Sequence, residues 1–135
     1  MRKNDILLDT HIILWAMQNN SKLNAMMKSY ILNPANRIYY SIASMWEVQI
    51  KYMVGKMPIS GIEFMHYCEQ SGYHKLPIDD SHVVELAGLE RDENAPPHND
   101  PFDRIMISQA KAEGFLFLSH DSMLEAYNEP CVIQV

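Results

Sequence analysis

Short apolar segments with strand character alternate with helical segments along this sequence, and that alternation constrains the fold more than any single motif. Residues 5–9, 37–41, 115–119 and 131–135 are predicted strands, and residues 74–78 are predicted to be extended. Helical segments separate the strands, so each connection is long enough for the crossover that parallel strands require. We therefore predict an α/β fold, with a small central parallel β-sheet flanked by helices.

Three of the predicted helices carry features that a structure can test. Ser21 is the expected N-cap of the helix that ends before Asn33, and residues 79–91 are expected to form one helix. The helix over residues 43–55 has apolar residues at helical spacing, which predicts an inward face. The residues expected on that face are Trp46, Ile50 and Met53 or Val54.

The length and composition fit one globular domain over residues 1–135. Apolar residues make up 47% of the chain and charged residues 21%, with no repeat or linker. The apolar stretch near the start is interrupted at residues 9–11, so it predicts neither a signal peptide nor a membrane span, and a cytoplasmic location is expected. Cys68 and Cys131 form no CxxC motif and are interpreted as reduced core residues.

The formal net charge of −6 argues against a protein that binds nucleic acid through bulk electrostatics. The argument weakens if several acidic side chains are clustered around cations, because a bound divalent ion inverts the local field and can face a phosphate. The placement of the acidic residues therefore decides how the charge is interpreted.

Four acidic residues are predicted to meet at one edge of the sheet. Asp9 ends the first strand, and Asp121 comes two residues after the strand over 115–119. Glu47 and Asp103 lie early in helices, where an acidic residue is also favoured by the helix dipole. In a parallel sheet, strand ends and helix starts share an edge, and ligands bind there. Each acid alone has an ordinary explanation, whereas four at one edge indicate a site.

The electrostatics of such a cluster indicate its chemistry. Two carboxylates about 4 Å apart repel by about 4 kcal/mol at an effective dielectric constant of 20. Four of them need protons or cations for neutralisation, and oxygen ligands suit Mg²⁺ or Mn²⁺. One or two such ions held by carboxylates are suited to hydrolysing phosphodiester bonds. The sequence offers no Ser-His-Asp set, phosphate-binding glycine loop or Walker lysine as a rival chemistry.

Four segments together resemble a known family: ILLDTHIILW, SIASMWEVQIKYMVGK, HNDPFDRIMISQA and FLSHD. Their order and spacing are similar to those of PIN-domain ribonucleases, and most similar to the VapC-like toxins of type II toxin–antitoxin pairs, in the branch with H-x-D-P-F-D-R. The resemblance implies a three-layer fold and an endoribonuclease dependent on Mg²⁺ or Mn²⁺. It also implies a small antitoxin partner, an RNA substrate and a homodimer.

The same resemblance implies roles for individual residues. It places the family's four catalytic and metal-binding acids on Asp9, Glu47, Asp103 and Asp121. Ser119 stands where the family often has Thr or Ser, which implies that it orients a metal-bound water. Thr10, next to Asp9, is expected to support the site.

The segment around the third acid leaves alternatives open. Asp100 precedes Pro101 and suits a helix N-cap, and a catalytic role has about even odds. Arg104 pairs with Asp100 or contacts a substrate phosphate. His98 is a substrate or metal neighbour, although a lone loop histidine is more often solvated.

Two residues of the helix over 43–55 also have alternative readings. Lys51 lies four residues after Glu47, so it forms an ordinary helix salt bridge or, as the resemblance implies, helps to bind phosphate. Trp46 is expected in the core. Methionines at helical spacing fill core gaps, or present a face to an antitoxin segment.

Other functions remain as alternatives to the toxin ribonuclease. A housekeeping RNA-processing enzyme or a non-catalytic binding module would use the same scaffold. A phospho-accepting receiver domain shares the length and the α/β pattern. It requires an acidic pair at the first strand and an aspartate after the third, and this sequence has a single Asp9 at the first strand.

Overall fold

A parallel β-sheet forms the centre of the molecule in a computed structural model that describes residues 4–135. Residues 1–3 of the predicted single domain lie outside the described residues. The strand order is β3-β2-β1-β4-β5, and every neighbouring pair is parallel. The predicted α/β class with a parallel central sheet is confirmed. The strands are β1 (Asn4–Leu8), β2 (Asn36–Ser41), β3 (His74–Leu76), β4 (Leu116–Ser119) and β5 (Val132–Gln134).

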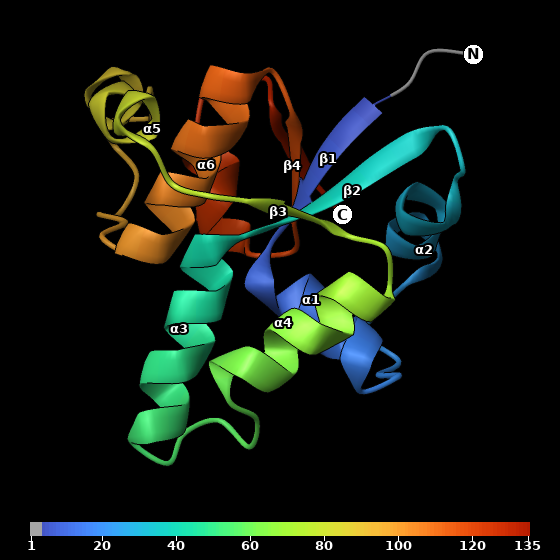
Figure 1. Cartoon of the computed structure of the whole chain (residues 1–135). Coiled ribbons are helices and arrows are strands. Elements are labelled where there is room, and N and C mark those ends of the chain that lie inside the picture. The colour runs from blue at the N-terminus through green and yellow to red at the C-terminus, as the bar shows by residue number, and fades with distance from the viewer. Residues whose placement is uncertain (1–3) are drawn as a thin grey trace.

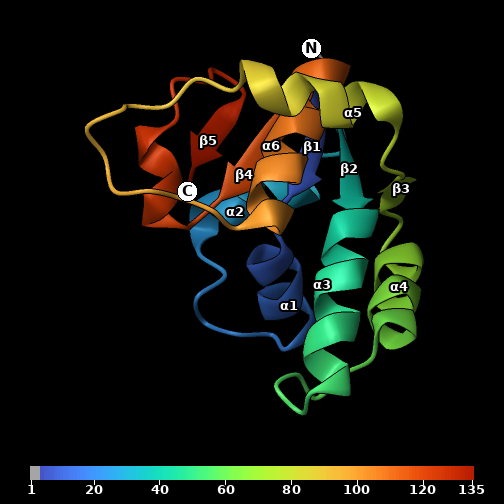
Figure 2. The same cartoon turned by 90° about the vertical axis from the view of Figure 1, so that its left-hand side faces the viewer.

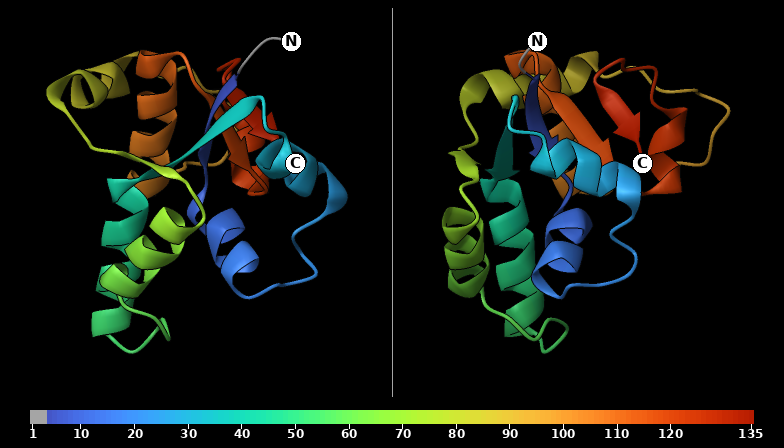
Figure 3. Two further views of the ribbon diagram at one scale, coloured as in Figure 1. Left: turned by 45° about the vertical axis from the view of Figure 1, so that its right-hand side comes forward. Right: turned by 90° about the vertical axis from the view of Figure 1, so that its right-hand side faces the viewer.

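Helices connect the strands and cover the sheet on both sides (Figure 1). Figure 2 shows α5 and α6 in front of the strands, and the right-hand view of Figure 3 shows α2 over the opposite face. No helix within residues 4–135 is long and apolar enough to cross a membrane. The α-helices are α1 (Thr10–Met17), α2 (Ala25–Leu32), α3 (Ile42–Met53), α4 (Gly61–Gln70), α5 (Asp80–Glu85) and α6 (Pro101–Glu113), and the 3₁₀ helices are η1 (Leu86–Gly88) and η2 (Ser122–Ala126).

Strand β1 is buried on both faces and divides the core into two clusters. Ile6 and Leu8 pack into the cluster that includes residues of α1, α2 and α4. Leu7 points the other way, into the cluster with residues of α6 and η2. This alternation follows from the two-residue period of a strand, and it explains why the segment is continuously apolar.

The strand order places a topological switch beside β1. The chain leaves β1 for β2 and β3 on one side, whereas β4 and β5 lie on the other side. Leu8 pairs with Leu118, and the Asp9 amide donates to the Leu118 carbonyl at 3.0 Å. The residues that follow β1 and β4 are therefore neighbours at the carboxyl edge of the sheet, where ligands bind in such folds.

The expected inward face of α3 is wrong. Trp46 is 56% exposed and Met53 72%, and Ile50 and Val54 are also exposed. The buried residues of α3 are instead Ala43, Ser44, Glu47 and Val48. The apolar residues do lie on one face of the helix. The helix turns its other face, which carries Glu47, towards the sheet edge, so the apolar face is on the solvent side.

Two other predicted helices differ in their ends. Helix α2 begins at Ala25, because the side chain of Asn24, not that of Ser21, accepts a hydrogen bond from the Met27 amide. The helix predicted over residues 79–91 ends at Glu85 and continues as the 3₁₀ helix η1. Its start is as expected, because the Asp79 side chain accepts from the His82 amide and the His82 ring accepts from the Asp79 amide.

Candidate active site

Asp9 and Asp121 line one hollow at the switch point, and both contact the Ser119 hydroxyl. Asp9 is 3% exposed at the end of β1. The Ser119 hydroxyl donates to Asp9 Oδ2 at 2.7 Å, and it accepts from the Asp121 amide at 3.1 Å. Burial is the main cause that raises the pKa of Asp9, to about 6, and the negative charge of Glu47 adds to it. Ser119 thus orients the Asp9 carboxyl directly.

Asp103 is repelled by four other acidic residues. It occupies the first turn of α6, the helix that runs back into β4, so it points towards the same edge. Its pKa is raised to about 8, mainly by burial and then, in decreasing order, by repulsion from Asp9, Asp100, Glu47 and Asp121. The charges of Asp9, Glu47 and Asp121 therefore all act on the Asp103 carboxyl.

His98 is buried in this cluster, so its expected solvation is wrong. It is 8% exposed, and its Nε2 lies 3.2 Å from Asp103 Oδ2. Its Nδ1 lies 2.7 Å from the Tyr127 hydroxyl. Desolvation lowers the pKa of His98, which favours the neutral ring. Atoms of His98, Asp103 and Asp121 that could ligate a metal all lie within 4.8 Å of one another.

Tyr127 is a residue of the site that the sequence reasoning missed. Its hydroxyl accepts from Arg104 Nη1 at 3.1 Å, which leaves its proton for His98 Nδ1. His98 then donates from Nε2 to Asp103. No ion pair joins Arg104 and Asp100 within residues 4–135, so the first reading of Arg104 is wrong. Tyr127 lies 23 residues from Arg104 in the sequence, and no motif signals that contact.

Asp100 is the N-cap of α6. Its Oδ1 accepts from the Phe102 amide at 2.9 Å and from the Asp103 amide at 3.2 Å, and Pro101 occupies the first turn. The structural reading of this residue is confirmed. The cap also fixes where α6 begins, and therefore where Asp103 points.

Glu47 and Lys51 form the helix salt bridge that their spacing predicts. Lys51 Nζ lies 2.9 Å from Glu47 Oε2. The Glu47 side chain is 7% exposed and that of Lys51 39%, so the acid is inside the cluster and the ammonium group is at its rim. Lys51 therefore offsets part of the negative charge of the site.

The Thr10 hydroxyl contacts the scaffold of the site, whereas its backbone forms a hydrogen bond that lowers the pKa of Asp9. Its hydroxyl lies 2.8 Å from the Ser44 hydroxyl, which in turn reaches Met106 Sδ. All three residues are buried. Thr10 thus joins the start of α1 to α3 and α6, the two helices that carry Glu47 and Asp103.

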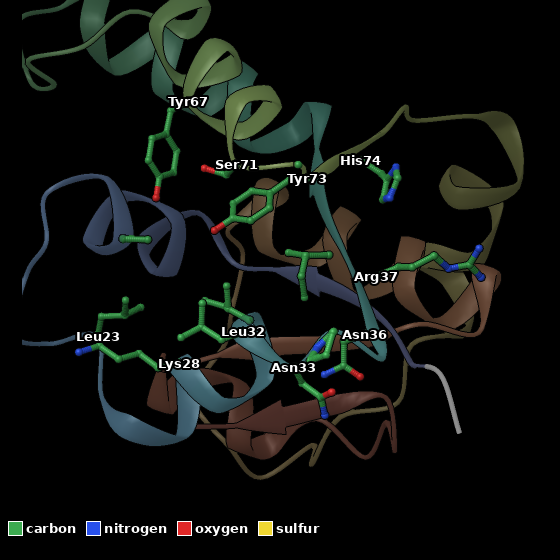
Figure 4. A pocket seen from close by; sticks show the side chains of 15 residues that line it. Leu23, Lys28, Leu32, Asn33, Asn36, Arg37, Tyr67, Ser71, Tyr73 and His74 are labelled. Carbon is green, nitrogen blue, oxygen red and sulfur yellow. The ribbon is translucent and has the colours of Figure 1, made fainter. Parts of the chain in front are cut away.

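Two hollows differ in their relation to the acids. One of about 250 Å³ is lined by Asp9, Asp121 and three aromatic or imidazole rings. The larger one, of about 520 Å³, lies between α2, α4 and β2 (Figure 4). Tyr67 and Tyr73 point into it, and none of the candidate acids lines it. Its size does not make it the active site, because it contains no carboxylate.

The sequence profile of the PIN domain matches residues 6–130, which include every acid of the cluster. This chain belongs to the PIN domain family. None of the curated proteins compared with it matches significantly.

Solved structures have the same fold as this PIN domain at low sequence identity. A chain of VapBC2 from Rickettsia felis, bound to a promoter DNA fragment, superposes with a TM-score of 0.67 at 14% identity, over 97% of this chain and 98% of that one. DNA-bound VapBC from Salmonella typhimurium gives 0.66 at 14% identity, with 97% and 98% covered. FitAcB from Neisseria gonorrhoeae gives 0.57 at 20% identity, with 90% and 91% covered.

The donor set of this PIN domain fits a hard divalent cation. Its carboxylate oxygens suit Mg²⁺ or Mn²⁺, whereas both ring nitrogens of His98 are already within hydrogen-bond distance of Tyr127 and Asp103. Burial is the main cause of the raised pKa values of Asp9 and Asp103, and repulsion from neighbouring acids adds to it at both residues. A cation would relieve the same repulsion that now favours protonation.

Proposed function

We propose that this PIN domain is a divalent-metal-dependent endoribonuclease and the toxin of a toxin–antitoxin pair. PIN domains are generally nucleases. The observation that supports the proposal is the buried carboxyl of Asp103, whose pKa is raised to about 8 by desolvation first and by repulsion from the neighbouring acids second. A buried acid with a strongly raised pKa beside other acids is typical of functional sites.

In this proposal, Asp9, Glu47, Asp103 and Asp121 hold one or two Mg²⁺ or Mn²⁺ ions. Bound metal would supply an activated water and stabilise the leaving oxygen of the phosphodiester. His98 orients the Asp103 carboxyl through its Nε2, and Ser119 orients that of Asp9. These two contacts hold the carboxylates before substrate arrives, which reduces the reorganisation that the reaction requires.

Lys51 and Arg104 are proposed to contact the RNA backbone. Both lie at the rim of the acids, and each already has a partner, Glu47 and Tyr127 respectively. A substrate phosphate would therefore exchange with, or add to, an existing contact. Because the guanidinium group has five N–H donors, Arg104 can hold Tyr127 and a phosphate together.

The antitoxin partner is proposed from the likeness in fold, because the similar chains come from VapBC and FitAcB structures. The homodimer is proposed from the resemblance of the sequence motifs to the VapC-like toxins. Co-purification with the product of a neighbouring gene and sedimentation of the purified chain test the two points separately.

The decisive experiment compares the wild type with Asp103→Asn on structured RNA, with Mg²⁺ or Mn²⁺ present. We expect the wild type to cleave, and the variant to lose activity by about 100-fold or more, because the loss removes a buried ligand of the cation. Glu93→Gln is the matched control, since Glu93 is an exposed carboxylate in the loop before α6.

Equal cleavage by the wild type and Asp103→Asn would refute the assignment of the site. Cleavage of no RNA, together with no Mn²⁺ binding by calorimetry, would favour a non-catalytic module. The toxin assignment has its own test: expression in a bacterial host should arrest growth for the wild type and not for Asp103→Asn. An active enzyme without growth arrest would favour a housekeeping ribonuclease.

A further inference from the structure

A hollow lined by rings opens directly beside the candidate metal site. It has a volume of about 250 Å³, and its lining residues are Asp9, His11, Trp15, His120 and Asp121. The Trp15 and His120 rings meet edge to face, with centroids 5.5 Å apart, and the His11 ring lies 6.2 Å from that of Trp15. His11, Trp15 and His120 have no part in the mechanism proposed above.

The fold holds these rings in place from two directions. His11 and Trp15 are four residues apart on α1, so they lie on the same face of that helix. His120 joins them because β4 runs beside β1, which brings its following turn to the start of α1. Trp15 also packs against the core, so its position is fixed without a ligand.

The orientation of His120 is set by a hydrogen bond. Its Nδ1 lies 2.5 Å from the Val135 backbone oxygen, and a carbonyl oxygen only accepts, so Nδ1 carries the proton. In the neutral ring, Nε2 then carries the lone pair. His120, a lining residue of the hollow, thus adds a hydrogen-bond acceptor to its ring surfaces.

The chemistry of the hollow favours a small, flat, neutral ligand. Its volume is below the roughly 300–1,000 Å³ of pockets for drug-sized molecules, so a single ring system is the better match. Asp9 and Asp121 in its wall disfavour an anion. Lys22 Nζ already lies 5.9 Å from the Trp15 ring centroid, which disfavours a second cation such as a guanidinium group.

We infer that this hollow binds one unpaired nucleobase of the RNA, adjacent to the phosphate that is cleaved. The inference rests on the proposed ribonuclease function and specifies how that site selects its substrate. Base–aromatic contact also supplies affinity that a chain of net charge −6 cannot draw from phosphates alone. An unpaired base enters such a hollow and a paired one does not, so cleavage is confined to single-stranded positions.

Binding is tested first, without any cleavage. In the Trp46→Phe background Trp15 is the single tryptophan, and adenosine and uridine are neutral, uncleavable probes. We expect at least one nucleoside to quench Trp15 fluorescence saturably. His120→Ala should weaken that binding several-fold, and His66→Ala, an exposed histidine on α4, should leave it unchanged. Saturable quenching by L-arginine amide and by neither nucleoside would overturn the inference in favour of a peptide partner.

Substrate selection is tested next with RNA that carries one abasic nucleotide, moved stepwise past the mapped cleavage position. At one flanking position we expect kcat/KM to fall about 5-fold or more for the wild type. For Trp15→Leu and His120→Ala, the same abasic RNA should lower kcat/KM little further, because these variants have already lost the contact with the base. Because Trp15 also packs in the core, His120→Ala carries the result if Trp15→Leu does not fold.

The two hypotheses fail in different ways. Suppose that the wild type cleaves RNA and Asp103→Asn does not. If an abasic nucleotide then lowers kcat/KM equally in the wild type and in His120→Ala at every position, the base site is wrong and the ribonuclease proposal remains. If the wild type cleaves no RNA, the proposed function fails, and the nucleoside titration decides on the base site independently.

Discussion

Asp103 is the residue at which burial and charge repulsion act together most strongly. Its ordinary pKa is 3.8, and in the folded chain it is raised to about 8 by desolvation and by the neighbouring acids. In the absence of metal the protonated form is therefore the favoured one at neutral pH. In the proposed site a cation would compete with a proton for this carboxylate, so metal binding would be coupled to proton release.

This competition predicts how the stability of the metal-free protein depends on pH. Between about pH 4 and about pH 8 the folded state binds more protons at Asp103 than the unfolded state, so the free energy of unfolding falls as pH rises. The free energy of unfolding can be measured by chemical denaturation in EDTA for the wild type and for Asp103→Asn. The difference between the two should fall as pH rises. Mn²⁺ at pH 8 should restore stability to the wild type more than to the variant. A difference that is flat over this range would contradict the assigned pKa.

Tyr127 is connected to Asp103, a proposed metal ligand, through His98. It accepts from Arg104 and donates to His98, which contacts Asp103, so the four side chains form one hydrogen-bonded series. Tyr127 does not itself contact Asp103, and we assign it a positioning role.

We expect Tyr127→Phe to lower the free energy of unfolding by about 1–3 kcal/mol, because a buried acceptor on His98 loses its donor. Urea denaturation measures that loss. Cleavage should fall through kcat more than through KM, since substrate contacts remain. Tyr52→Phe, at an exposed tyrosine on α3, is the control, and identical behaviour of the two variants would remove Tyr127 from the network.

At the scale of elements, helix α6 carries most of the site. Its N-terminus is set by the Asp100 cap and Pro101, and Gly114 ends it in a left-handed conformation with φ of 74°. The thirteen residues between these ends place Asp103 and Arg104 at the carboxyl edge of the sheet and bury Ile105 to Ala110. A shift of the cap by one residue would rotate Asp103 away from the other acids.

Two substitutions at Asp100 separate its cap from its charge. Asp100→Ala should cost about 1 kcal/mol of stability, because the Phe102 and Asp103 amides lose their acceptor. Asp100→Asn should retain that stability, since asparagine is an equally good N-cap, and cleavage should be nearly unchanged. Thermal unfolding and RNA cleavage measure the two effects. Loss of cleavage with full stability in Asp100→Asn would instead show that the charge acts in catalysis.

At the scale of the whole molecule, the acidic net charge limits how the proposed RNA substrate could be held. The chain has 11 Lys and Arg against 17 Asp and Glu, and the two cations at the rim of the site are already paired. Few phosphates can then be neutralised by the protein. Affinity has to come from the divalent cation and from contacts with bases.

We therefore expect weak salt dependence of RNA binding. Each contact with a single strand contributes about −0.7 to the slope of log K against log salt, so two or three contacts give a slope between about −1.4 and about −2.1. Fluorescence anisotropy with Asp103→Asn over a series of KCl concentrations measures this slope. A slope steeper than about −4 would indicate an extended basic surface and contradict the argument from charge.

The sequence by itself determined the class of fold and the edge where the acids meet. Continuous apolar strands and the helices between them specify parallel pairing, and parallel pairing brings strand ends and helix starts together whatever the side chains do. The roles of Asp9, Glu47, Asp103 and Asp121 stay a prediction. The N-cap at Asp100 could be predicted from the sequence, because a cap and its helix are neighbours in the chain.

Only the tertiary structure decided which way each face turned and which distant side chains met. Trp46 and Ile50 have core-like spacing, yet α3 buries Glu47, because its start after β2 fixes its rotation. His98 is buried because Tyr127, 29 residues away, covers it. Local periodicity carries no information on such contacts, which depend on strand order and on how each helix packs against the sheet.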